Sequence, residues 1–112
     1  MIKMSVYYPA ARGSEFDHAY YRLSHMPLIR DRLGDACLRY EIDKGLGGRE
    51  PGSAPGFIAA CHIYSPDLET LMRAYGPHRV EIVADVANYT DISPIVQISE
   101  VIEEQGAGAR RS

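Results

Sequence analysis

A histidine and two tyrosines lie close together in the segment Tyr20–Leu28, which reads Tyr-Tyr-Arg-Leu-Ser-His-Met-Pro-Leu. Imidazole titrates near neutral pH and phenols form hydrogen bonds, so this group could transfer protons or hold a polar small molecule. The segment has a helical pattern that Pro27 interrupts. Because Pro27 lacks an N–H and disfavours helical backbone at Met26, we expect the helix to kink or restart there. At such a break, His25 would be free to point into a cavity.

His25 is therefore the first candidate for a catalytic residue, as the group that transfers a proton. Tyr21 precedes it by four residues and shares its helical face if the helix continues that far, so its hydroxyl could orient a substrate. Tyr40, which lies between two apolar residues of a predicted strand, could do the same. The alternative for His25 is a structural hydrogen bond to loop backbone, and for Tyr21 it is aromatic packing.

Three further residues are candidates for ligand binding: His62, His78 and Tyr89. His62 has apolar neighbours on its side of a predicted strand, so it lines either a cavity or an interface between subunits. His78 lies on the apolar face of the second predicted helix, where a neutral ring that donates to a nearby carbonyl is the alternative. Tyr89 belongs to a predicted turn at residues 88–91.

The spacing of the remaining reactive residues argues against other kinds of site. The four histidines have no paired spacing and no clustered carboxylates, so no metal site is predicted. Cys61 lacks a base beside it, because His62 points to the opposite face of the strand. No glycine-rich phosphate loop joins a strand to a helix. We therefore predict a protein that works without metal or cofactor.

Length and composition limit the possible functions further. The chain has 112 residues, of which 46% are hydrophobic, as expected for one folded domain with a small core. A net charge of −3 argues against nucleic acid or an anionic membrane as partner. No apolar run approaches the roughly 20 residues of a membrane-spanning helix. The first residues lack the features of a signal peptide, and Cys37 and Cys61 follow no redox spacing, so we expect a cytoplasmic protein.

The hydrophobic pattern alternates between periods of 2 and 3.6 residues, which predicts four strands and two helices. The first helix is expected to begin near Glu15 with Ser14 as its cap, and to end at Gly34. The sequence Ser65-Pro66-Asp67 caps the second, and Gly76-Pro77 interrupts it. Strands are expected at residues 2–8, 37–46, 57–64 and 92–102. This βαββαβ order is the α+β ferredoxin-like plan, an antiparallel sheet with both helices on one face.

Both faces of the expected sheet carry apolar residues. In the third strand, one face has Ala59, Cys61 and Ile63, and the other has Ile58, Ala60, His62 and Tyr64. Helices on one side leave the second face uncovered. We therefore expect a homodimer in which another copy of the sheet covers it.

Two segments fall outside this regular pattern. The stretch Gly45–Gly56 is rich in Gly and Pro and exceeds an ordinary hairpin turn. It could gate a cavity, run passively over the surface or embrace a partner subunit. The end of the chain has the composition of a disordered tail, so we expect one folded domain over residues 1–103 and disorder over residues 104–112.

Several short motifs occur in a fixed order along the chain. Tyr20-Tyr21 is followed by His25-Met26-Pro27-Leu28, and later motifs are Gly45-Leu46, Tyr75-Gly76-Pro77-His78, Asn88-Tyr89-Thr90-Asp91-Ile92 and Val96-Gln97-Ile98-Ser99-Glu100-Val101. In this order and spacing the chain resembles the EthD family of the dimeric α+β barrel group, from Met1 to about Glu104. One departure is that the family usually has Phe where Tyr75 stands.

The resemblance implies two subunits whose sheets face each other as a barrel, with a small-molecule cavity between sheet and helices in each. The family takes its name from a gene cluster that degrades ethyl tert-butyl ether. A related lactone-isomerising branch uses a histidine in the His-Met-Pro motif, and other barrel relatives cyclise polyketides or oxidise polyphenols without a cofactor. Kinship of this kind does not assign a reaction.

Two functions of different class follow from these observations. The first is a cofactor-independent enzyme that acts by acid–base catalysis on an apolar, oxygen-bearing organic molecule, as an isomerase, a cyclase or an oxidative catabolic enzyme. The second is a non-catalytic protein that holds a hydrophobic metabolite for a partner enzyme in a catabolic or biosynthetic pathway. The absence of a complete nucleophile–base pair in the sequence favours the second.

Overall fold

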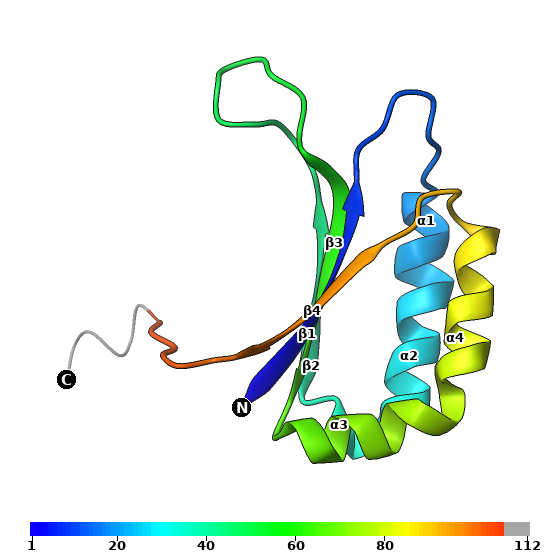
Figure 1. Ribbon diagram of the computed structural model, residues 1–112, viewed down its shortest axis with the longest axis vertical. Helices are drawn as coiled ribbons and strands as arrows, with labels where there is room; N and C mark the ends of the chain where they lie inside the picture. Colours follow the sequence, from blue (N-terminus) through cyan, green and yellow to red (C-terminus); the bar gives the residue numbers. More distant parts are fainter. Residues whose placement is uncertain (107–112) are drawn as a thin grey trace.

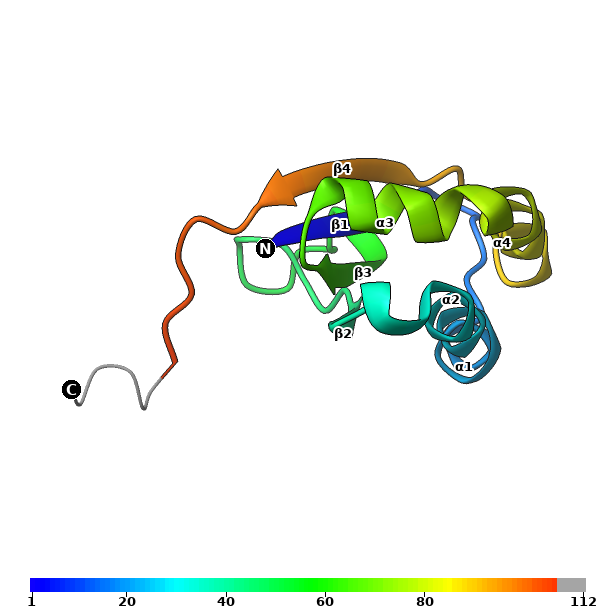
Figure 2. The ribbon, with the colours of Figure 1, turned by 90° about the horizontal axis from the view of Figure 1, so that it is seen from below.

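Within residues 1–106, the part of the chain that the computed structural model describes, four antiparallel strands form one sheet and the helices lie on one of its faces (Figures 1 and 2). The strands are β1 (Ile2–Pro9), β2 (Arg39–Lys44), β3 (Phe57–Ser65) and β4 (Ile95–Glu100), in the spatial order β2-β3-β1-β4. The helices are α1 (His18–Tyr20), α2 (Met26–Leu33), α3 (Leu68–Tyr75) and α4 (Arg79–Asp85). The predicted α+β ferredoxin-like plan is confirmed.

The first helical segment is continuous rather than broken at Pro27. Between α1 and α2, Tyr21–His25 form a π-helical turn, whose hydrogen bonds reach five residues along the chain instead of four. Met26 keeps right-handed helical angles (φ −66°, ψ −40°), and its N–H donates to the carbonyl of Tyr21. The predicted kink is therefore wrong, because the wider turn lets the backbone continue without a break. The alternative, a restart, is confirmed, since the regular α-helix begins again at Met26 with Pro27 in the first turn of α2.

Aspartates mark the starts of both helical segments. Asp17 caps α1 by accepting a backbone hydrogen bond of 3.0 Å. The predicted cap, Ser14, lies too early, because the chain is still extended at Phe16, where it forms a β-bridge. Asp67 caps α3, as predicted, through a hydrogen bond of 2.7 Å.

The second helical segment changes direction at the 3-10 turn Gly76–His78, so that α3 and α4 lie at a steep angle to each other (Figure 1). The predicted interruption at Gly76-Pro77 is thus confirmed. After the turn, α4 runs beside α2, and Arg32 of α2 pairs with Glu81 of α4 at 2.8 Å. The bend therefore lets α3 close one end of the helical layer while α4 continues along it.

The strand register decides which side chains face the helices. The apolar residues that pair across three neighbouring strands point toward them: Met4, Val6, Cys61, Ile63, Val96 and Ile98. On the opposite face, Ser5, His62 and Gln97 form one row across the same strands. Glu41 of β2 pairs with His62 and extends this row. The face of the sheet that points away from the helices, here called the outer face, is therefore more polar than the residues of β3 alone predict.

The loop between β2 and β3, at residues 45–56, is held by its own hydrogen bonds. The N–H of Gly48 donates to the carbonyl of Ser53 at 3.2 Å, and the Ser53 hydroxyl donates to the carbonyl of Glu50 at 2.6 Å. The loop leans toward the face of the sheet opposite the helices (Figures 1 and 2). Its position is therefore on the side where a partner sheet would lie.

The last described residues, 101–106, form neither helix nor strand. Glu104 pairs with Arg39 of β2 at 3.1 Å. The predicted disordered tail, residues 104–112, lies mostly outside the described residues. Among the helices of residues 1–106, none has the length and hydropathy needed to cross a membrane.

The close packing of Gly45, the first residue of the loop, against the backbone of Phe57 can be tested by substitution. A Cβ at this position would lie 2.1 Å from the carbonyl oxygen of Phe57, so Gly45→Ala should lower the free energy of unfolding. We expect a loss of about 1–3 kcal/mol, measured by urea denaturation. Gly56→Ala is the matched control, because a Cβ there would meet nothing within 4 Å. Equal stability of the two variants would contradict this account.

Candidate active site

A cavity of about 370 Å³ lies between the sheet and the helices. Most of its wall is apolar, with Met4, Val6, Cys61, Ile63, Val96 and Ile98 on the sheet and Ile29, Met72, Ile82, Val83 and Val86 on the helical side. Val96 and Ile98 stay 56% and 39% exposed although they face the helices, so the cavity opens along the β4 edge. Its volume is in the range of small-molecule sites.

His25 lines this cavity and is held by Asp85, the last residue of α4. The residue is only 3% exposed, and its Nδ1 lies 2.9 Å from Oδ2 of Asp85. Since an ionised carboxylate can only accept, Nδ1 carries the hydrogen and donates it. Nε2 has no hydrogen-bond partner among residues 1–106, which leaves its lone pair for a molecule in the cavity.

Two more donors hold Asp85 in place. The Tyr20 hydroxyl donates to its Oδ1 at 2.7 Å, and the Asn88 amide donates to the same oxygen at 2.9 Å. Burial alone would raise the pKa of Asp85, but these bonds and that from His25 together bring the pKa below its ordinary value. Asp85 is therefore ionised at neutral pH.

Burial also decides the charge of His25. Burial lowers the pKa of His25 from its ordinary 6.5 and outweighs the hydrogen bond and charge of Asp85, which raise it. The ring is neutral at pH 7, and Nε2 can then accept a proton. Because the pKa is lowered, this capacity persists below pH 6.5 and is lost only as the pH falls through the pKa of the folded protein.

Tyr21 lies beside His25 on the same side of the helix. The two rings stack with centroids 5.6 Å apart and planes 15° apart, so they do share a face. The Tyr21 hydroxyl is buried and has no hydrogen-bond partner among the described residues. Burial raises its pKa far above the ordinary value of 10, so it remains a donor. An unpaired buried donor costs about 1–3 kcal/mol, which favours an acceptor on a bound molecule.

Two further tyrosines support the histidine. The hydroxyls of Tyr8 and Tyr89 lie 2.6 Å apart, and burial raises the pKa of Tyr8 to about 12. The ring of Tyr89 packs against His25, with centroids 4.6 Å apart. Tyr8 lines the cavity, whereas Tyr89 does not. Tyr89 therefore packs against the side of the His25 ring that faces away from the cavity, and helps to fix the position of this ring.

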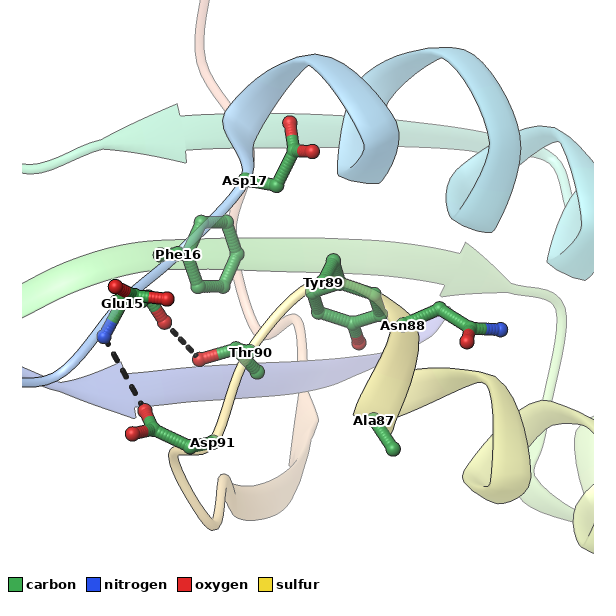
Figure 3. A pocket seen from close by; sticks show the side chains of 8 residues that line it. All are labelled: Glu15, Phe16, Asp17, Ala87, Asn88, Tyr89, Thr90 and Asp91. Atoms are coloured by element: carbon green, nitrogen blue, oxygen red, sulfur yellow. Dashed lines mark hydrogen bonds between the residues drawn. The ribbon is translucent and has the colours of Figure 1, made fainter.

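A larger hollow of about 540 Å³ lies on the surface beside Tyr89 (Figure 3). Both aspartates in its lining already bind the backbone. Asp17 caps α1, and Asp91 accepts the N–H of Glu15 at 3.2 Å. We therefore place the candidate site in the smaller apolar cavity, where His25 and an unpaired hydroxyl meet.

The other predicted site residues lie outside the lining of the cavity. Tyr40 is half-buried against the core on β2, and His78 ends the 3-10 turn between α3 and α4. His62 is on the outer face of the sheet. There its Nδ1 lies 2.7 Å from Oγ of Ser5 and its Nε2 lies 3.1 Å from Oδ2 of Asp43.

Of the six predicted site residues, the structure brings His25 and Tyr21 together at the cavity. Sequence reasoning missed Asp85, which lies 60 positions from His25. The only signal was a carboxylate three residues after Ile82, next to the apolar stripe of the second helix. In the part of the chain that the structure describes, no group of three or more His, Cys, Asp or Glu could hold a metal ion.

Comparison with known proteins gives one family and a set of similar structures. The EthD domain model matches residues 13–93. A crystal structure of an EthD-like protein from Ralstonia eutropha JMP134 is 47% identical, covers 93% of this chain and 94% of that chain, and has a TM-score of 0.89. An ethyl tert-butyl ether D (EthD) family protein from Bacillus halodurans C-125 is 19% identical, with 91% and 99% covered and a TM-score of 0.63. HapK from Hahella chejuensis is 9% identical, with 95% and 99% covered and a TM-score of 0.55. None of the curated proteins compared with the sequence matches it.

The contact between His25 and Asp85 can be tested by titration. Asp85→Asn removes the charge that raises the pKa of His25, so the pKa should fall further below 6.5. Histidine NMR signals followed against pH measure the change. Asp91→Asn is the control, because Asp91 binds the backbone of Glu15 instead. An unchanged or higher pKa of His25 in Asp85→Asn would exclude the contact.

Proposed function

This chain belongs to the EthD family, and on that premise we propose that it catalyses cofactor-independent proton transfer on an apolar, oxygen-bearing organic molecule held in the cavity. The observation that carries the proposal is the neutral His25, held by Asp85 at 2.9 Å with its Nε2 unpaired in an apolar cavity. A fixed, neutral imidazole of this kind is suited to general base catalysis near neutral pH.

In the proposed reaction, Nε2 of His25 removes a proton from a carbon next to a carbonyl group. The electron pair of the broken C–H bond moves onto the carbonyl oxygen, and the Tyr21 hydroxyl donates a hydrogen bond to that oxygen. Asp85 stabilises the imidazolium that forms. In a substrate with a carbon–carbon double bond beside the deprotonated carbon, the product is a dienolate. The electron pair on its oxygen re-forms the carbonyl, the double bonds shift, and the far (γ) carbon takes the proton back from Nε2. This completes an isomerisation that needs no oxidant, reductant or metal.

The apolar wall also supports a second function, a non-catalytic protein that holds a hydrophobic metabolite. Apolar side chains dominate the lining, and the described residues contain no nucleophile paired with a base there. In this case His25 and Tyr21 would supply hydrogen bonds to the ligand without chemistry. The two functions differ in what happens to the protons of a bound carbon acid.

Hydrogen–deuterium exchange separates the two functions. In D₂O the protein should accelerate exchange of the acidic C–H protons of 2-tetralone, an apolar ketone, as followed by proton NMR. His25→Ala should slow this exchange about 10²-fold or more while ketone binding changes little. The rate should fall as the pH drops through the lowered pKa of His25. Binding of the ketone without exchange above the buffer rate would favour the non-catalytic function.

We also propose that two copies of the chain pair through the outer face of the sheet. Ile95 is exposed on that face beside Tyr7, and the rings of Tyr7 and Phe57 pack with centroids 5.2 Å apart. This apolar group lies next to the loop that leans toward the same side. A second sheet would cover both features.

Light scattering at micromolar concentration tests the pairing. The protein should have the mass of a dimer, and Ile95→Lys should shift it toward the monomer, because it places a charge in the proposed interface. Val80→Lys, at an exposed position of α4 on the helical side, is the matched control. A monodisperse monomer in the unchanged protein would contradict the proposal.

A further inference from the structure

One arginine interrupts the apolar helical wall of the cavity. Arg79 precedes Ile82, Val83 and Val86 by three, four and seven residues, so all four lie on one face of the helix, and all four line the cavity. A guanidinium stays charged at every physiological pH. The stripe that packs over the cavity therefore begins with a permanent positive charge.

This charge has no counterion in the part of the chain that the structure describes. Several other arginines are paired, such as Arg32 with Glu81 at 2.8 Å and Arg39 with Glu41 at 2.6 Å. Arg79 makes no such pair or hydrogen bond, and no carboxylate is among the residues that line the cavity. His25 is neutral, so the cavity has one cation and no anion.

Tyr75 lies next to Arg79 and also lines the cavity. Burial raises the pKa of the Tyr75 phenol, and the charge of Arg79, four residues further along, lowers it in part. The hydroxyl remains protonated and can donate a hydrogen bond beside the guanidinium. It stands where the family resemblance implies a Phe, so this chain has a polar donor at an otherwise apolar position.

We propose that the ligand of this cavity is an amphipathic organic acid, a hydrocarbon ring or chain with one carboxylate that Arg79 and Tyr75 bind. The inference rests on the proposed function only in taking the cavity as the ligand site. Arg79 and Asp85 are at opposite ends of α4, about 9 Å apart at 1.5 Å per residue. The carboxylate of the ligand is thus bound near the start of α4, at the end opposite to Asp85 and its contact with His25.

A pair of probes of equal shape tests the charge. Isothermal titration with 4-phenylbutanoate and 4-phenylbutanamide should show that the unchanged protein binds the acid about 10-fold or more tightly, with a preference that weakens in high salt. Arg79→Gln should abolish the preference, and Arg79→Lys should keep part of it. Arg73→Gln is the matched control, because Arg73 pairs with Glu69 on exposed α3 and should leave the preference unchanged.

Equal affinity of the unchanged protein for the two probes would overturn the inference, as would a preference that survives in Arg79→Gln. So would failure of the acid to bind at millimolar concentration. The test of ligand binding and the test of proton transfer can fail independently. Exchange of 2-tetralone without preference for the acid would overturn only the ligand class, whereas preference for the acid without exchange would overturn only the proton transfer.

Discussion

The hydrogen bond between His25 and Asp85 joins the two helical segments over the sheet, and the properties of the site depend on it. It selects which ring nitrogen carries the hydrogen, and so leaves Nε2 to face the cavity as an acceptor. It also partly offsets the cost of burying the imidazole. Tyr20 and Asn88 hold the carboxylate from the other side, which fixes the ring against the stacked phenol of Tyr21.

The π-helical turn is what allows this contact. On an ideal α-helix, His25 would lie opposite the stripe formed by Phe16, Tyr20 and Leu23. In the structure His25 is buried and Leu23 is 64% exposed, because the wider turn changes the direction in which the following side chains point. The same turn brings Pro27 into the first turn of α2 without a kink. One irregular turn therefore gives the helix both its continuity and its inward-facing histidine.

The order of the elements could be predicted from periodicity, because strands and helices place apolar residues at different intervals. The candidate histidine was also visible, since it stands beside tyrosines and a proline. Asp85, the hydrogen-bond partner of His25, could not be predicted from the sequence, because it becomes a neighbour of His25 only when α4 packs beside the first helical segment. Which apolar residues of the last strand face the helices could not be read from alternation alone. Val96 and Ile98 lie on the helical side, across a cavity that no side chain fills, and this becomes evident only from the strand register.

The cavity opens along β4, which is an edge strand because it pairs only with β1 among the described strands. An edge strand presents backbone N–H and C=O groups that have no partner in the sheet. These groups border the entrance, and amino-acid replacement cannot remove them, except where a proline eliminates an N–H. Evolution can thus change the shape of the wall and its one charge, while a polar backbone rim at the entrance is inherited with the fold. A ligand that enters this cavity therefore passes a row of backbone donors and acceptors before it reaches the apolar wall.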